Sequence, residues 1–334
     1  MKNITLIVMA TTLLAACAHT GAPDPHTPPD WVSGDSRDYP QAQYLLGRGQ
    51  AERPDLSRDR ARADLARIFE VAISEATRDI QTFTSTREGA DSGSDIRRAL
   101  QTHTERVISG VEIADQWRDP DSEQQHALAI LPRSRPTRSL REQIGELDRA
   151  TSQLIERARD SNEPLRQAGA ATRALELQHQ RQALQRSLQA IDADGRGVAA
   201  QWSVAELSES HRELIQRIHI QPLASGQDSE RLTQMLGGAL AEAGFSVSER
   251  GPYRMSAQLD YERMGPRDGW YWYRGSLRTT LEDAHGTTRD SQLWDLRISA
   301  SEAELARARL FEEIEKLLRA QVASALRGPG DDSP

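Results

Sequence analysis

The chain has 334 residues, of which 37% are hydrophobic and 28% charged, and its formal net charge is −8 at pH 7. This length allows about two domains, and an acidic chain is a poor nucleic-acid binder because phosphate binding needs a basic surface. The single cysteine, Cys17, excludes an intramolecular disulfide and a metal site built from several thiolates, so the fold must be held by packing.

Residues 1–16 have the layout of a signal peptide. A positive charge at Lys2 precedes an apolar run from Ile4 to Leu14, and small residues lead to Cys17. The run is shorter than the ~20 apolar residues that span a bilayer. An ordinary secretory signal with a chance cysteine is the alternative, but the LAAC sequence that ends at Cys17 resembles the lipobox of bacterial lipoproteins. In a lipobox the cysteine is acylated and becomes the first residue of the mature chain, so the resemblance implies lipidation of Cys17.

Residues 17–30 are rich in Pro, Thr, Gly and His, a composition typical of a flexible tether. The residue after the cysteine is Ala18, and by resemblance to lipoprotein sorting rules a residue other than aspartate implies the outer membrane. Several acyl chains together hold a protein stably in a membrane, since each buried methylene contributes ~0.8 kcal/mol. We therefore expect a lipid-anchored protein of the outer membrane that faces the periplasm.

Residues 31–135 are predicted to form a small α+β domain. Apolar residues at three- and four-residue spacing predict a helix over Leu56 to Thr82, with Ser57 as its N-cap. Two strands are predicted after it, over Val107 to Trp117 and over His126 to Leu131.

Residues 136–194 are predicted to form a long antiparallel helical hairpin. Its two helices, Thr137 to Arg159 and Glu163 to Ile191, are rich in Leu, Ala, Gln, Arg and Glu. Pro164 suits the first turn of the second helix, where its missing N–H costs nothing. The polar faces of these helices are either solvated or form an arm on which a partner docks.

Residues 200–327 are predicted to form an α+β domain in which strands gather between helices, with a disordered tail over residues 328–334. The predicted elements are, in order, a helix over Val204 to Gln216, a strand over Arg217 to Leu223, a helix over Ser229 to Ala243, four strands over Phe245 to Glu249, Tyr253 to Tyr261, Gly269 to Leu281 and Arg289 to Ser299, and a helix from Ser301 to Leu326. This order predicts a sheet packed against helices, so the whole chain is of the α+β class.

The most unusual local feature is an aromatic run in the third of these four strands. In a strand, Trp270 and Trp272 face one side of the sheet while Tyr271 and Tyr273 face the other. One pair can enter the core, and the other must meet solvent, a loop or a partner. Either both pairs pack locally, or one pair forms an exposed aromatic ladder that binds a protein or a glycan.

The sequence contains no recognisable catalytic or metal-binding constellation. The eight histidines are scattered singly, and no Gly-x-Ser-x-Gly elbow is present. The run from Gly47 to Gly49 begins like a dinucleotide-binding loop but lacks the third glycine, so a role other than phosphate binding is favoured. We therefore expect a protein that is not an enzyme and that carries no cofactor or metal.

Residues 29–131 resemble the LPP-twenty (LPP20) lipoprotein family of Gram-negative bacteria. The matching segments follow the lipobox in order and are Pro29 to Val32, Tyr44 to Ala51, an Ala/Arg-rich helix around Ala61 to Arg67, Ile108 to Trp117, and His126 to Leu131. His126 departs from the family pattern, in which a tyrosine often precedes the final Ala-Leu-Ala. The resemblance implies a non-enzymatic role in the envelope or at the flagellum, and it carries over no catalytic residues.

These observations predict an accessory or structural lipoprotein that binds another envelope component. The predicted contacts are the membrane, through the acyl chains on Cys17, and an envelope protein or peptidoglycan, through residues 270–273; no nucleic acid is expected. Two alternatives stay open. One is a regulator of a cell-wall synthase, and the other is an envelope hydrolase whose carboxylates the sequence does not reveal.

Overall fold

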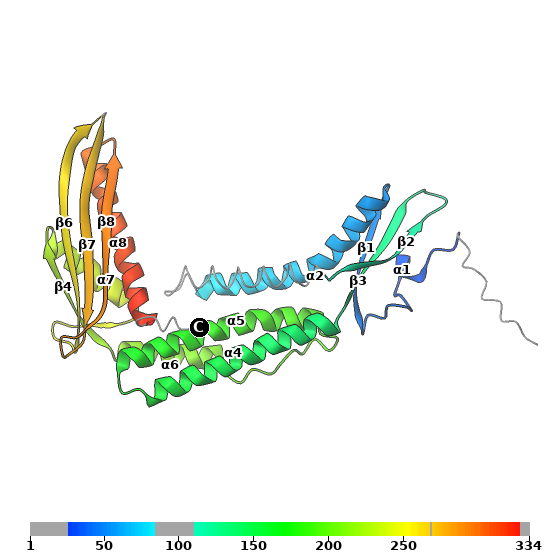
Figure 1. Cartoon of the computed structure of the whole chain (residues 1–334), viewed down its shortest axis with the longest axis horizontal. Coiled ribbons are helices and arrows are strands. Elements are labelled where there is room, and N and C mark those ends of the chain that lie inside the picture. Colours follow the sequence, from blue (N-terminus) through cyan, green and yellow to red (C-terminus); the bar gives the residue numbers. More distant parts are fainter. Residues whose placement is uncertain (1–25, 84–109, 268, 328–334) are drawn as a thin grey trace, which may run out of the picture.

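The computed structural model describes residues 26–83, 110–267 and 269–327. Figure 1 shows an elongated molecule with an α+β unit at each end of a pair of long helices. Cys17, the predicted lipidation site, lies outside the described residues. None of the helices in the described ranges has the length and apolar character needed to cross a membrane. The mixed helices and sheets confirm the α+β class predicted from the sequence.

The N-terminal unit is a three-stranded antiparallel sheet in the order β1-β3-β2, with α2 packed on it. Its elements are α1 (Asp30–Ser33), β1 (Tyr44–Ala51), α2 (Pro54–Phe83), β2 (Glu112–Arg118) and β3 (Gln125–Pro132).

Two details of this unit differ from the prediction: β1 is an additional strand, and Ser57 is not the N-cap of α2. The helix begins at Pro54, a residue that fits the first turn because it needs no N–H partner there. Ser57 is fully buried, and its Oγ donates to the carbonyl oxygen of Pro54 at 2.8 Å.

Gly47 and Gly49 lie in β1 at the point where α2 approaches the sheet most closely. A Cβ atom on Gly49 would lie 2.0 Å from the carbonyl oxygen of Ser57, and one on Gly47 would lie 2.3 Å from that of Ala61. Any side chain at these positions would therefore push the helix off the strand. The two glycines are explained by helix packing.

The two long helices α4 (Ser134–Asp160) and α5 (Pro164–Ile191) pack side by side between the two units. Near the start of α5, Leu165 and Ala168 are buried in the C-terminal core. Near its end, Leu184 and Leu188 are buried in the N-terminal core. At 1.5 Å per residue, this helix of 28 residues is about 42 Å long. The two cores therefore share one helix.

A buried ion pair joins the two long helices. Arg181 on α5 donates from Nε to both carboxylate oxygens of Asp148 on α4, at 2.9 and 3.2 Å, and the two side chains are 4% and 16% exposed. Nη2 of Arg181 also donates to the carbonyl oxygens of Val198 and Ala199, at 3.2 and 2.9 Å. One side chain thus fixes α4, α5 and the segment that follows them.

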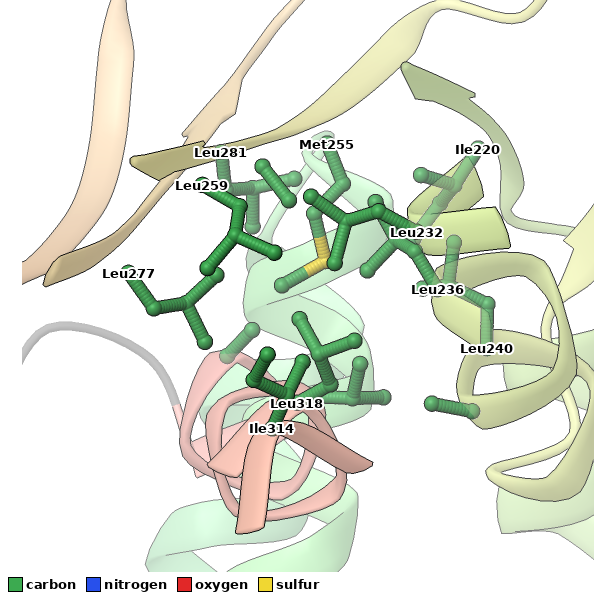
Figure 2. Close-up of a cluster of buried hydrophobic side chains, with 14 of the residues drawn as sticks. Ile220, Leu232, Leu236, Leu240, Met255, Leu259, Leu277, Leu281, Ile314 and Leu318 are labelled. Atoms are coloured by element: carbon green, nitrogen blue, oxygen red, sulfur yellow. The ribbon is translucent and has the colours of Figure 1, made fainter. Parts of the chain in front are cut away.

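The C-terminal unit is a five-stranded sheet in the order β5-β4-β6-β7-β8, with α7 and α8 packed on it. Its elements, together with the helix α6 that precedes them, are α6 (Val204–Gln216), β4 (His219–Gly226), α7 (Ser229–Glu242), β5 (Ser246–Val247), β6 (Tyr253–Arg267), β7 (Trp270–Glu282), β8 (Thr288–Ala300) and α8 (Ala303–Arg327). β4 runs parallel to β5 and β6, whereas β6, β7 and β8 are antiparallel neighbours. Figure 2 shows the core between the layers, where Leu277 from the sheet faces Ile314 from α8 and Leu236 from α7.

Candidate functional site

Alternation along β7 places the four aromatic residues at its start on two faces of the sheet. Trp270 and Trp272 point away from the helices and are 46% and 40% exposed. Tyr273 points toward the helices and is 6% exposed, and Tyr271 is half-buried against the same core. The indoles therefore form an exposed pair, and the tyrosines anchor the strand to the core.

A network of rings and hydrogen bonds fixes the tyrosine side of β7. The ring of Tyr273 meets that of Tyr261 on β6 edge to face, with centroids 5.5 Å apart. The hydroxyl of Tyr261 donates to Asp228 at the start of α7, and the other carboxylate oxygen of Asp228 accepts from Arg307 on α8 at 2.8 Å. Burial, together with the hydrogen bond to Asp228, raises the pKa of Tyr261, so its hydroxyl keeps the proton that it donates. The backbone that carries the tryptophans is thus tied to both helices.

The face that carries Trp270 and Trp272 is the open side of the sheet. On this face none of the side chains of β6, β7 and β8 with a described burial is buried. Leu223 on β4 and Leu293 on β8 share the face and are 39% and 55% exposed. Charged residues of both signs occupy much of the remainder, namely Arg254, Asp260, Glu262, Arg274, Arg278, Asp295 and Arg297.

Two buried histidines and one groove are the other notable polar and hollow features of the described residues. In these residues no group of three or more His, Cys, Asp or Glu side chains could hold a metal ion. Burial lowers the pKa of both His179 and His211 to about 4, and His211 Nε2 lies 2.8 Å from Thr172 Oγ1. Both are therefore neutral interior residues at neutral pH. A groove of about 490 Å³ between α4, α5 and α6 is lined largely by apolar side chains such as Trp202 and Leu207.

Residues 29–131 match the model of the LPP20 lipoprotein family. This match confirms the resemblance predicted from the sequence, and it covers the N-terminal unit from α1 to most of β3. The helical pair and the C-terminal unit lie outside it. No curated protein matches the chain.

Several solved structures show weak similarity. A minor lipoprotein from Acinetobacter baumannii is 14% identical with a TM-score of 0.28, and the alignment covers 34% of this chain and 96% of that one. The secreted protein HP1454 from Helicobacter pylori is 13% identical with a TM-score of 0.40, over 84% of this chain and 97% of that one. Lipoprotein GNA1162 from Neisseria meningitidis is 14% identical with a TM-score of 0.22, over 30% and 97%. Similarities this low carry no inference about function.

Proposed function

We propose that this chain is a cell-envelope lipoprotein, anchored in the outer membrane through acylated Cys17 and facing the periplasm, which binds an envelope protein without catalysing a reaction. The observation that carries the binding role is the exposure of Trp270 and Trp272 on the open face of the five-stranded sheet. The lipoprotein part is supported by the signal sequence that ends at Cys17 and by the family match at residues 29–131.

Two half-exposed indoles on one strand are a favourable surface for a partner to cover. A tryptophan side chain can bury up to ~250 Å² at ~25 cal/mol per Å², so covering the exposed part of each indole contributes about 2–3 kcal/mol. Tryptophan and arginine are the residues that most often dominate binding energy at protein interfaces, and Arg274 follows Trp272 on the same face. Acidic residues such as Glu262 alternate with the arginines. This mixed charge favours a protein surface over a polyanion.

The hydrolase alternative would need a carboxyl group with a raised pKa in a cleft, where it could act as a general acid. The carboxyl groups with shifted pKa values in the described residues are those of Asp119 and Asp283, and both values are lowered. Hydrogen bonds from Ser122 to Asp119 and from the Thr287 backbone to Asp283 are the largest causes. Such turn hydrogen bonds stabilise local structure, and neither carboxyl group has the raised pKa that a general acid needs.

Pull-down from envelope fractions tests this role. The full chain is compared with the Trp270→Ala/Trp272→Ala double variant and with Leu305→Ala, a control on α8 whose side chain is 42% exposed. We expect the wild type and the control to retrieve the same envelope protein and the double variant to lose it. Retrieval of that protein by the double variant would contradict the proposal. So would a wild-type chain that retrieves lipid and peptidoglycan fragments alone.

A further inference from the structure

β8 is the long edge strand of the C-terminal sheet. It spans 13 residues, pairs with β7 along its length, and within the described ranges pairs with no other strand. Its register with β7 is regular from Ala300 down to Asp290, and it contains no proline. Edge strands of this kind offer unpaired backbone groups to a second strand, which proteins ordinarily prevent with bulges, prolines or short edges.

One hydrogen bond indicates which backbone groups face the open edge. The carbonyl oxygen of Ser299 accepts from Arg309 Nη1 of α8 at 3.0 Å, which places it on the side away from β7. In an antiparallel ladder, residues that face the partner strand alternate with residues that face away from it. Leu293, Asp295 and Arg297 therefore present their N–H and C=O groups to the open edge.

We propose that β8 pairs with β8 of a second copy of this chain, antiparallel and about a two-fold axis at Leu296. In this register Asp295 lies opposite Arg297 of the second copy, and the two-fold repeats this pair, so two ion pairs form across the interface. An axis at Asp295 or at Arg297 would place like charges opposite each other, and an axis at Trp294 would place Asp295 opposite Leu293. Among these axis positions, the one at Leu296 places opposite charges on the two strands next to each other. A two-fold interface requires such a self-complementary arrangement.

The backbone and the inner face of the sheet fit the same register. Asp295 and Arg297 both face the open edge, so each opposite pair can exchange two backbone hydrogen bonds. The next pair, Leu293 with Ser299 of the second copy, forms its bonds when Arg309 releases the carbonyl oxygen of Ser299. On the inner face, the half-buried Trp294 lies opposite the half-buried Ile298 of the second copy. The pairing would therefore cover apolar side chains that the edge now leaves half-buried.

The helix layer also accommodates a second copy. α8 packs under both β7 and β8. Since neighbouring strands lie about 4.8 Å apart, a helix centred under these two strands lies about 5 Å from the axis, and the two copies of α8 lie about 10 Å apart. Packed helices usually lie 8–10 Å apart. The interface uses the edge of the sheet and leaves Trp270 and Trp272 uncovered, so it is independent of the partner site proposed above.

Sedimentation equilibrium of the full chain in detergent, with charge-reversal variants, tests the proposal. Asp295→Arg and Arg297→Asp should each raise the dissociation constant of the dimer at least about tenfold, because each turns two attractive contacts into two repulsive ones. The combined variant should restore the dimer, since it exchanges the two charges. A wild-type chain that is monomeric at all concentrations overturns the proposal, as does a double variant no tighter than the single ones.

Disulfide formation tests the position of the axis. In a Cys17→Ser background, Leu296→Cys places two thiols in a pair whose Cα atoms lie about 4.5 Å apart, within disulfide range. Leu293→Cys on the same strand is the matched control, because its two copies would be separated by about 20 Å. We expect oxidation to link the Leu296→Cys chain and to leave the control monomeric. Equal linkage of the two variants, or linkage of the control alone, would exclude this register.

Discussion

Removing the carboxylate of Asp148 should lower the free energy of unfolding by about 3–5 kcal/mol. Asp148→Ala leaves the guanidinium of Arg181 without its counter-ion in a site where that side chain is 4% exposed. An unpaired buried charge of this kind costs about 3–5 kcal/mol. This is a large fraction of the ~5–15 kcal/mol by which most proteins are stable. The loss is greater than that of an ordinary ion pair because the side chain of Arg181 cannot reach water.

A double-mutant cycle separates this explanation from a simple loss of packing. Arg181→Met keeps the volume and removes the charge, so the double variant should be more stable than Asp148→Ala alone. Urea denaturation followed by the helical circular dichroism signal measures all three. Glu209→Ala is the control, since its ion pair with Arg212 is exposed and should contribute under about 1 kcal/mol. A cost below about 1 kcal/mol for Asp148→Ala, or strictly additive single effects, would refute the reasoning.

Three further predictions, one of them with a matched control, rest on separate physical causes. Cys17→Ser should release the protein from membranes in a fractionation experiment, and full retention would contradict the lipid anchor. Gly49→Ala should destabilise the fold by about 1–3 kcal/mol in urea denaturation, because its Cβ would lie 2.0 Å from a backbone oxygen of α2. Gly145→Ala on α4, with no atom within 4 Å of its Cβ, should be neutral or stabilising by up to about 1 kcal/mol; equal costs for the two would rule out the packing argument. Burial, and then the charge of Arg212, lowers the pKa of His211 from 6.5 to about 4. The unfolded chain therefore binds this proton first, and stability falls by up to about 3 kcal/mol as the pH drops from 6.5 through 4. His211→Gln should remove this part of the pH dependence and leave the part that His179 contributes, because burial lowers the pKa of His179 to about 4 as well. An unchanged profile in unfolding measurements would contradict the assignment to His211.

The helices and strands that could be predicted from the sequence are those whose own residues indicate the secondary structure. The long stretches rich in Leu, Ala, Gln, Arg and Glu indicate α4 and α5, and the strand predicted over Gly269 to Leu281 corresponds to β7. The sequence also indicates which face of β7 is buried. Leu277 and Leu281 lie an even number of residues from Tyr273, so the three side chains share one face, and all three are buried. The tryptophans had to face outward once those leucines faced the core.

The features that the sequence could not supply depend on contacts between distant segments. β1 was missed because its two glycines are unusual in a strand, and they are explained only by the approach of α2. The sequence also does not show that α5 belongs to two cores. Its buried residues lie on several sides of the helix, so no single apolar stripe identifies what it packs against. The edge position of β8 follows from the strand order, which local periodicity does not contain.

The helix α5 fixes the orientation of the sheet that carries both proposed interactions, namely partner binding through Trp270 and Trp272 and pairing of β8 with a second copy. Because α5 is buried in both cores, the C-terminal sheet cannot reorient relative to the N-terminal unit without exposing apolar residues such as Leu165 or Leu188. The C-terminal sheet is therefore held at a set distance from the N-terminal unit, since Leu165 and Leu188 lie about 35 Å apart along α5. Pairing through β8 would join two such sheets into one continuous sheet surface with two pairs of tryptophans. A partner that engages both pairs would then bind with an avidity that neither pair has alone. Loss of the dimer would weaken such binding without abolishing it, whereas loss of Trp270 and Trp272 would abolish binding and leave the dimer intact.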